Sequence, residues 1–228
     1  TAVDRLQGFM RQVHSSLSAD LAGHERAEKG WYLQLDIATF FNSIHRPTLY
    51  ALLKNRIAKN ADNLPQAPLL QRLCHALLRR NQARSAHMRA TVQELAQVPY
   101  HKRLLNAAPQ CGLAIGNLSS QFFANVYMNE LDQFVKHELK CKRYVRYVDD
   151  FVLVDQSKAQ LLQWQTQIET FITMRLHLKL KVGSKCEPLR RGCDFLGYVV
   201  YPQHRTVRAR VVTHCHSKLA DWARAYVT

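Results

Sequence analysis

The sequence lacks the long apolar run that a membrane-spanning segment needs. No stretch approaches the roughly 18 residues required to cross a bilayer, and residues 1–5 (TAVDR) do not form a basic region followed by an apolar one. Internal repeats and low-complexity linkers are absent as well. We therefore expect a soluble chain of one large or two small domains, without an export signal, that acts in the cytoplasm and does not engage a membrane.

The six cysteines follow no paired pattern. None belongs to a C-x-x-C pair, which favours reduced thiols over a disulfide scaffold. The adjacent residues His214, Cys215 and His216 could suggest zinc, but we expect them on an extended segment, where neighbouring side chains diverge. A zinc site is therefore not predicted.

Acidic residues are scarce. Asp and Glu number 17 against 32 Lys and Arg, which gives the 228-residue chain a formal net charge of +15. Such an excess creates a positive field that attracts polyanions, so nucleic acid is the leading candidate partner. The alternative is a basic soluble protein with no such ligand, and charge alone does not separate the two.

Apolar positions recur at two periods along the chain. Helical spacing predicts an opening helix over residues 3–17, a helix that begins at Arg46 and Pro47, one over 119–139 capped by Ser119 or Ser120, and one that begins at Ser157. Strands are predicted over 31–36, 144–154, 176–182, 195–201 and 206–209. Residues 59–110 are polar and basic, with helical stretches such as 69–78 and no periodic strand pattern. This arrangement predicts an α+β fold whose sheet is covered by helices on one face.

Two of the few acidic residues, Asp149 and Asp150, lie within an apolar stretch. Like charges in such a setting raise each other's pKa unless a cation neutralises them. Adjacent side chains of a strand point to opposite faces, so both can reach one site only if they occupy the turn of a hairpin. Asp36, at the end of its own predicted strand, could complete a three-carboxylate cluster suited to Mg²⁺ or Mn²⁺. The competing interpretation makes Asp149 and Asp150 ordinary turn residues.

Four segments, in order, resemble motifs of reverse transcriptases. Residues 147–153 (YVDDFVL) resemble the Y-x-D-D hairpin of that family, and residues 35–44 (LDIATFFNSI) resemble its first catalytic motif. Residues 112–125 (GLAIGNLSSQFFAN) resemble the motif that passes under the incoming nucleotide, and residues 195–198 (FLGY) resemble the motif whose turn supports the primer end. The resemblance covers nearly the whole chain.

The resemblance implies a polymerase palm, with a ferredoxin-like antiparallel sheet, and part of the fingers. In those terms residues 1–30 are a remnant of the fingers with a leading helix, 31–58 the first part of the palm, 59–110 a fingers/palm insertion and 111–228 the second part of the palm, with no thumb. Because the basic fingers segments and the thumb are missing, we expect these residues alone to bind metal and nucleotide weakly and to extend a primer poorly.

The same resemblance assigns roles to individual residues. It implies two Mg²⁺ ions, with Mn²⁺ as a substitute, held by the catalytic residues Asp36, Asp149 and Asp150 and by the carbonyl of Ile37. Nucleotide-binding residues are Thr39, Phe40, Phe41, Ile115, Gly116, Gln121 and Lys185, and primer-end residues are Phe195, Leu196, Gly197 and Tyr198. Phe41 falls where the family keeps an aromatic that excludes a ribose 2′-hydroxyl, although core packing is a competing role. Lys181 is an alternative to Lys185 as the lysine that faces the triphosphate, and either could instead be a solvated surface lysine.

The implied activity is RNA-directed DNA synthesis. The enzyme would add deoxynucleotides to a 3′-hydroxyl by two-metal phosphoryl transfer, and its partners would be an RNA template, a DNA primer or product, and deoxynucleoside triphosphates. An idle palm that binds RNA or protein is one alternative, and a phosphodiesterase or nucleotide cyclase is another. Three crowded carboxylates argue against the first, and the segment 112–121 argues against the second.

One motif points to a branch of the family. Most branches carry Gln before the second glycine of the nucleotide-binding motif and Ser-Pro after it, whereas this chain has Ile115, Gly116 and then Ser119, Ser120 and Gln121. That pattern, together with residues 99–104, resembles the reverse transcriptases of diversity-generating retroelements. Those bacterial or phage enzymes make frequent errors at template adenines and act with an accessory helical-bundle protein. Antiphage-defence and other bacterial reverse transcriptases are the alternative branches.

Overall fold

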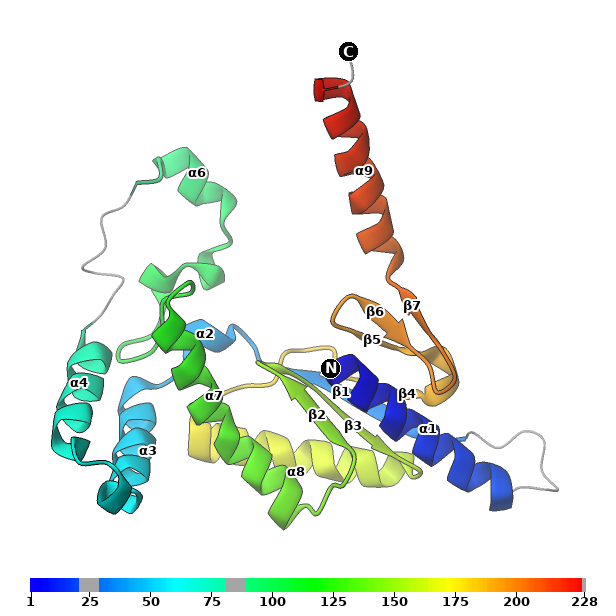
Figure 1. The fold of residues 1–228 in the computed structure, drawn as a ribbon, viewed down its shortest axis with the longest axis horizontal. Coiled ribbons are helices and arrows are strands. Elements are labelled where there is room, and N and C mark those ends of the chain that lie inside the picture. The colour runs from blue at the N-terminus through cyan, green and yellow to red at the C-terminus, as the bar shows by residue number, and fades with distance from the viewer. Residues whose placement is uncertain (21–28, 81–88, 227–228) are drawn as a thin grey trace.

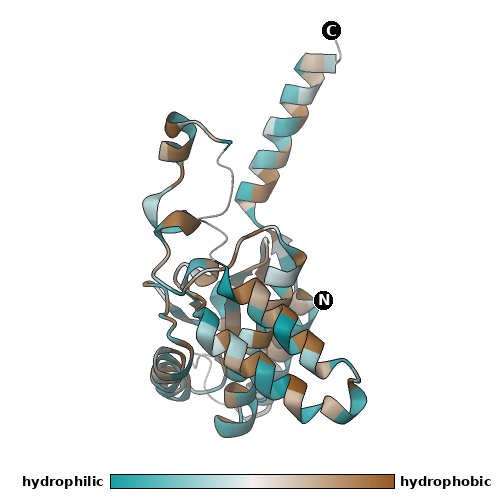
Figure 2. Ribbon diagram, turned by 90° about the vertical axis from the view of Figure 1, so that its left-hand side faces the viewer, coloured by the Kyte–Doolittle hydropathy of each residue, from teal (hydrophilic) through white to brown (hydrophobic). Residues whose placement is uncertain are grey.

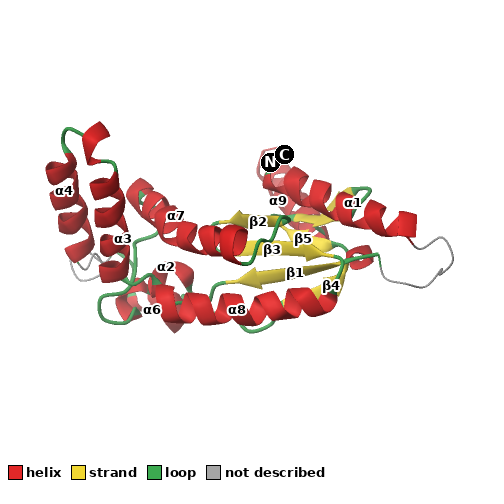
Figure 3. Cartoon of the chain, turned by 90° about the horizontal axis from the view of Figure 1, so that it is seen from below, coloured by secondary structure: helices red, strands yellow, loops and turns green. Residues whose placement is uncertain are grey.

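A four-stranded antiparallel sheet forms the centre of the molecule. The computed structural model describes residues 1–20, 29–80 and 89–226. The sheet has the order β2-β3-β1-β4, formed by β1 (Trp31–Asp36), β2 (Tyr144–Tyr147), β3 (Asp150–Asp155) and β4 (Lys185–Pro188). β2 and β3 form the predicted hairpin, and β3 pairs with β1 along its whole length. Figure 3 shows the strands side by side, with helices on both sides of the sheet.

One face of this sheet packs against two long helices. Successive side chains of a strand alternate between faces, and Leu33, Leu35, Phe151 and Leu153 all contribute to the same buried cluster. They are covered by α7 (Leu118–Gln133), which continues as the π-helical turn η4 (Phe134–Glu138), and by α8 (Lys158–Leu176). The predicted α+β class is confirmed.

The opposite face is covered in part, which the sequence did not predict. Tyr32 and Val152 belong to a second buried cluster, together with the apolar side chains of α1 (Ala2–Asp20). Figures 1 and 3 show α1 lying along the sheet. A three-stranded sheet made of β5 (Cys193–Phe195), β6 (Tyr198–Val200) and β7 (Arg205–Val207) completes this second core. The expectation of one covered face was wrong because the amphipathic α1 needs a partner for its buried side, and the sheet provides it.

Most predicted helices are confirmed, but one cap was wrong. α3 (Arg46–Lys59) begins with Pro47 in its first turn, and the Ser157 hydroxyl accepts a hydrogen bond from the Gln160 N–H at the start of α8. The N-cap of α7 is Asn117, whose side chain makes no capping hydrogen bond. Ser120 is instead buried within the helix, which starts earlier because the chain turns at Gly116, where φ is 101°.

The insertion between the two halves of the sheet is helical. The short helix α2 (Phe40–Ser43) precedes α3. Between α3 and α7, the regular elements of the described residues are all helices: η1 (Ala61–Asn63), α4 (Ala67–Arg79), α6 (Val92–Gln97), η2 (Tyr100–Lys102) and η3 (Leu104–Asn106). In α6 the Thr91 and Glu94 side chains form a capping box. The described part of residues 59–110 contains no strand, as predicted.

Two predictions near the C-terminus were wrong. α8 extends to Leu176, and the fourth strand of the sheet is Lys185–Pro188 instead of 176–182, where only Leu180 forms an isolated bridge, to Ile37. A further helix, α9 (Ala209–Tyr226), projects from the body, with apolar and polar residues mixed along its length (Figures 1 and 2). Residues 214–216 therefore lie in a helix and not on an extended segment. Among the described residues, no helix is long and apolar enough to cross a membrane.

Candidate active site

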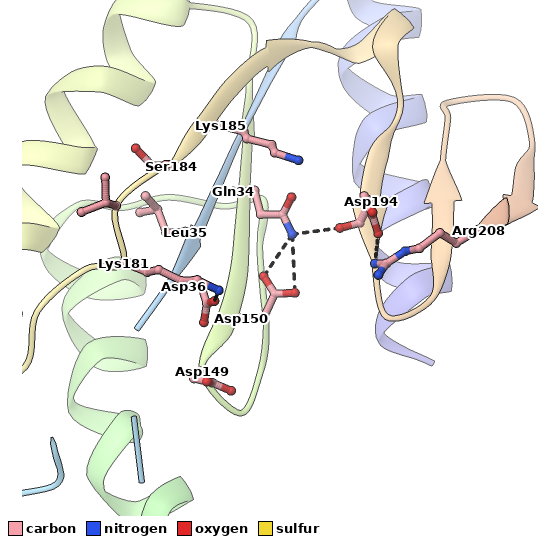
Figure 4. A pocket seen from close by; sticks show the side chains of 12 residues that line it. Gln34, Leu35, Asp36, Asp149, Asp150, Lys181, Ser184, Lys185, Asp194 and Arg208 are labelled. Carbon is pink, nitrogen blue, oxygen red and sulfur yellow. Dashed lines mark hydrogen bonds and ion pairs between the residues drawn. The ribbon is translucent and has the colours of Figure 1, made fainter. Parts of the chain in front are cut away.

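A cavity of about 450 Å³ opens where β1 ends and β3 begins. Its lining is mainly polar and includes all three of the carboxylates predicted to be catalytic. Figure 4 shows these side chains together with Lys181, Lys185, Asp194 and Arg208. The lining residues are Gln34, Leu35, Asp36, Asp149, Asp150, Lys181, Val182, Gly183, Ser184, Lys185, Asp194 and Arg208.

The strand register explains how two of the carboxylates meet. Asp36 is the last residue of β1, Asp150 is the first residue of β3, and the two are direct partners across the antiparallel pair. Opposed residues of such a pair point to the same face. Asp149 lies in the two-residue turn between β2 and β3, where Val148 adopts a left-handed conformation with φ of 57°. The turn thus releases Asp149 from strand alternation, while Asp150 belongs to the strand itself.

Asp149 and Asp150 lie in surroundings that disfavour their charged forms. Burial raises the pKa of Asp150 to about 6, and the negative charges of Asp36 and Asp149 add to that rise. Burial also raises the pKa of Asp149, with a contribution from Asp36. Both shifts show that the anionic forms are poorly compensated here, so a cation in the cavity would stabilise them.

Lys181 makes the direct ion pair with Asp36. Its Nζ lies 2.9 Å from Asp36 Oδ2, and its backbone N–H donates to the Asp36 carbonyl over 2.8 Å. This hydrogen bond raises the pKa of Lys181. Lys185 lines the same cavity from β4. Both candidate lysines therefore lie at the site, and Lys181 is the one bonded to a carboxylate of the cluster.

Among the lining residues that sequence reasoning missed, three connect by polar contacts to the carboxylate of Asp150. The Gln34 side-chain amide donates to Asp150 Oδ1 over 3.2 Å and to the Asp194 carbonyl over 2.9 Å, and Arg208 forms an ion pair with the Asp194 carboxylate. Gln34 could have been found, because a residue two positions before Asp36 in a strand shares its face. Asp194 and Arg208 offered no such signal, since only the tertiary fold brings them to the site.

The donor set fits a divalent cation chemically. Carboxylate oxygens are the ligands that Mg²⁺ and Mn²⁺ prefer. In the conformation described for residues 1–20, 29–80 and 89–226, no three His, Cys, Asp or Glu side chains converge closely enough to hold an ion. In Figure 4 the Asp36 carboxylate is directed to Lys181, and the Asp150 carboxylate is directed to Gln34.

The backbone around the predicted carbonyl ligand is held in place. Ile37 bridges to Leu180, and the neighbouring Ala38 N–H donates to the Lys179 carbonyl over 2.9 Å. The Ile37 side chain is buried. Metal binding by its carbonyl stays a prediction.

The predicted primer-end residues form a tight hairpin beside the cavity. Phe195 and Tyr198 pair across β5 and β6, and both residues between them, Leu196 and Gly197, have positive φ values of 50° and 87°. Two left-handed residues in a two-residue loop are typical of a primed hairpin turn. Asp194 belongs to the first strand of this hairpin and lines the cavity, so it connects the hairpin to the site.

Apart from Lys185, the residues predicted to bind nucleotide do not line this cavity. Phe40 is buried in the core, and Phe41 is half-buried with its ring edge-on at 5.3 Å from that of Phe40. Thr39 is exposed in a left-handed conformation, and its hydroxyl bonds to that of Ser43 over 2.9 Å. Ile115, Gly116 and Gln121 are all exposed.

The glycine-containing segment nevertheless lies beside α2. The Leu113 N–H donates to the Phe41 carbonyl over 2.8 Å, and the Gly112 N–H donates to the Ile44 carbonyl over 2.9 Å. A Cβ at Gly112 would lie 2.7 Å from Leu104 Cδ1, so this glycine serves packing. A Cβ at Gly116 would meet nothing within 4 Å. The open space beside the backbone is therefore at Gly116.

The fold and the cavity together define a palm-like α+β domain with acidic residues at the turn of its central hairpin. A family model described as "Reverse transcriptase (RNA-dependent DNA polymerase)" matches residues 3–200. The chain belongs to the reverse transcriptase family. No curated protein matches its sequence.

Proposed function

We propose that the protein is an RNA-directed DNA polymerase that adds deoxynucleotides to a primer 3′-hydroxyl on an RNA template. The observation that carries this proposal is the meeting of Asp36, Asp149 and Asp150 at one cavity from two separate segments of the chain. Family membership supports the reaction class, and the net charge of +15 suits nucleic-acid partners.

In this proposal the three carboxylates hold two Mg²⁺ ions, or Mn²⁺ in their place, with help from the Ile37 carbonyl. Bound ions would activate the 3′ oxygen and neutralise the departing pyrophosphate in an in-line transfer. The chain's own contribution is geometry. The β1–β3 register opposes Asp36 and Asp150, the turn adds Asp149, and Gln34 holds Asp150 toward the primer-end hairpin.

The remaining site residues form the two flanks of the proposed substrate site. Phe195, Leu196, Gly197 and Tyr198 would support the primer end from the hairpin that adjoins the cavity. Thr39, Phe40, Phe41, Ile115, Gly116 and Gln121 would form the nucleotide side, where the hydrogen bond from Leu113 places the backbone of Phe41 beside the glycine segment. In this arrangement Phe41 would exclude the ribose 2′-hydroxyl. The division into residues 1–30, 31–58, 59–110 and 111–228 belongs to the same proposal.

A primer-extension assay tests the function directly. A primed RNA template, deoxynucleotides and Mg²⁺ should give products whose length depends on the template. Conversion of nucleotides without a template would favour a cyclase or phosphodiesterase instead. RNA binding with no extension would favour an idle palm.

Of the two lysines, we assign Lys181 to the triphosphate. Replacing Lys181 with Met should lower kcat/KM for deoxynucleotides by about 10- to 100-fold, because a charge-assisted hydrogen bond contributes roughly 1.5–3 kcal/mol. Lys185→Met is the matched control, with an expected change below about threefold, since Lys185 makes no ion pair with the carboxylates within the described chain. Steady-state kinetics with a single nucleotide measures kcat/KM of both variants. A larger loss in Lys185→Met than in Lys181→Met would assign the triphosphate to Lys185 instead.

We further propose that the enzyme belongs to the branch of diversity-generating retroelements, with an accessory helical-bundle protein and a cytoplasmic location in a bacterial or phage system. Ile115 supports this proposal. Its side chain is 76% exposed, so it does not pack into the palm, and an exposed apolar side chain offers the incoming nucleotide no hydrogen bond. An accurate enzyme would instead favour an antiphage-defence or other bacterial branch.

Fidelity should therefore respond to residue 115. Ile115→Gln is expected to reduce misincorporation at template adenines by about tenfold, because a restored polar contact improves discrimination by roughly 1–3 kcal/mol. Leu118→Gln is the control, since Leu118 is an exposed apolar residue of the same segment. Sequencing of extension products measures the error rate, and an unchanged rate in Ile115→Gln would contradict the assigned role.

A further inference from the structure

A largely buried ion pair lies next to the turn that carries Asp149. Arg146 of β2 contacts Asp132 of α7 through both prongs of its guanidinium: Nε lies 2.8 Å from Oδ1, and Nη2 lies 2.7 Å from Oδ2. The two side chains are only 11% and 18% exposed. The Tyr144 hydroxyl also donates to Asp132 Oδ1, over 2.9 Å.

The same guanidinium reaches the catalytic turn. Arg146 Nη1 donates to the Val148 carbonyl over 2.9 Å and lies 3.4 Å from the Asn125 side-chain oxygen of α7. Val148 immediately precedes Asp149 and has a φ of 57°. A β-branched residue rarely adopts this conformation, and such a backbone persists only where its surroundings enforce it.

We propose that Arg146 is a positioning residue that holds the turn bearing Asp149 in the conformation that presents this carboxylate to the cavity, with Asp132 anchoring it to α7. This inference rests on the proposed function. Because α7 begins within the nucleotide-binding segment, the guanidinium links that segment to the catalytic turn. One side chain would thus set the distance between nucleotide and metal ligand.

The arrangement requires arginine in particular. Its planar fork presents several N–H groups at fixed angles, so it can bind Asp132 with two of them and still direct a third to the Val148 carbonyl. A lysine at this position keeps the charge beside Asp132 but loses the fixed geometry. The alternative role is structural: the pair would only attach α7 to the sheet, and the turn would not depend on it.

A comparison of Arg146→Lys with Tyr144→Phe separates these roles. Tyr144 contacts the same buried Asp132, and none of the hydrogen bonds described for it reaches the turn, so Tyr144→Phe is the matched control. Two properties of each protein are measured. Electron paramagnetic resonance gives the affinity for Mn²⁺ in the absence of nucleotide, and steady-state kinetics of primer extension gives kcat and KM. Thermal melts of both variants report the change in stability.

For Arg146→Lys we expect about tenfold weaker Mn²⁺ binding and a kcat lowered by about 30-fold or more, under conditions in which the variant is fully folded. For Tyr144→Phe we expect Mn²⁺ affinity and kcat within about twofold of the wild type. The inference is overturned if Arg146→Lys loses stability but retains wild-type Mn²⁺ affinity and kcat.

A double variant guards against misfolding. Removing one member of a buried ion pair leaves an uncompensated charge, whereas Arg146→Gln combined with Asp132→Asn leaves none. This neutral pair should fold and show the same losses of Mn²⁺ affinity and kcat as Arg146→Lys, and wild-type values would overturn the inference. A wild-type protein that neither binds Mn²⁺ nor extends a primer would overturn the proposed function, and this inference with it.

Discussion

Replacing Asp149 with asparagine is expected to lower primer extension on an RNA template with Mg²⁺ by at least about 1,000-fold. Such a loss corresponds to roughly 4 kcal/mol of transition-state stabilisation, which is within what a metal site contributes to phosphoryl transfer. Asp149 reaches the cavity from the turn between β2 and β3, and asparagine retains its size but not its charge. Single-turnover extension with a labelled primer measures the change.

Asp155 provides the control for this experiment. It is the last residue of β3, at the end of the strand away from the turn. Its carboxylate accepts a hydrogen bond from the Ser157 N–H, a bond that asparagine can also accept. Asp155→Asn should therefore extend primers at a rate within about threefold of the wild type. If Asp149→Asn kept more than about a tenth of the wild-type rate, Asp149 would not be an essential metal ligand.

Asp150→Asn should abolish extension to a similar degree and at the same time stabilise the fold. Burial and two neighbouring carboxylates raise the pKa of Asp150 from 3.8 to about 6, so its ionised form destabilises the native state at pH 7. The full shift would correspond to about 3 kcal/mol. Because the group is partly exposed to solvent, we expect a gain of about 1–2 kcal/mol in the free energy of unfolding. Asparagine can keep the hydrogen bond from Gln34.

The stabilisation by Asp150→Asn should depend on pH. Between about pH 4 and pH 6 the folded protein holds a proton on Asp150 that the unfolded chain has lost, so this group's contribution to stability falls as pH rises through that window. Urea unfolding of wild type and variant at pH 7 and pH 5 should show a difference that shrinks at pH 5. Mg²⁺ should stabilise the wild type more than the variant. A variant less stable than the wild type at pH 7 would contradict the assigned strain.

Short-range patterns were sufficient to predict most of what positions the carboxylates. Alternation over residues 31–36 and 144–154 predicted β1 and the hairpin. The need for Asp149 and Asp150 to reach one site predicted that both occupy its turn. The structure places Asp149 in the turn, whereas Asp150 is the first residue of β3. The capping hydroxyl of Ser157 was likewise visible in sequence. These features depend on neighbours along the chain, which is why the sequence alone contains them.

Contacts between distant segments could not be predicted in this way. The bonds from Gln34 to Asp194 and from Arg146 to Asp132 depend on how β1 meets β5 and how β2 packs on α7. The strand predicted at 176–182 was displaced because α8 uses residues up to Leu176. α9 was not predicted, although Val211, Val212, Leu219 and Trp222 have helical spacing, because none of its residues is buried and it has no apolar face packed against the body.

Helix α9 is attached to the body of the molecule at its N-terminal end, close to the cavity. None of its side chains is buried, and its root is held by Arg208, whose N–H donates to the Gly197 carbonyl and whose guanidinium binds Asp194. The Asp194 carbonyl in turn binds Gln34, which binds Asp150. An 18-residue helix is roughly 27 Å long, so a tilt of about 10° at the root moves its far end by about 5 Å. A change of angle at this root would therefore be amplified along α9, so the position of its tip depends on contacts that lead back to Asp150.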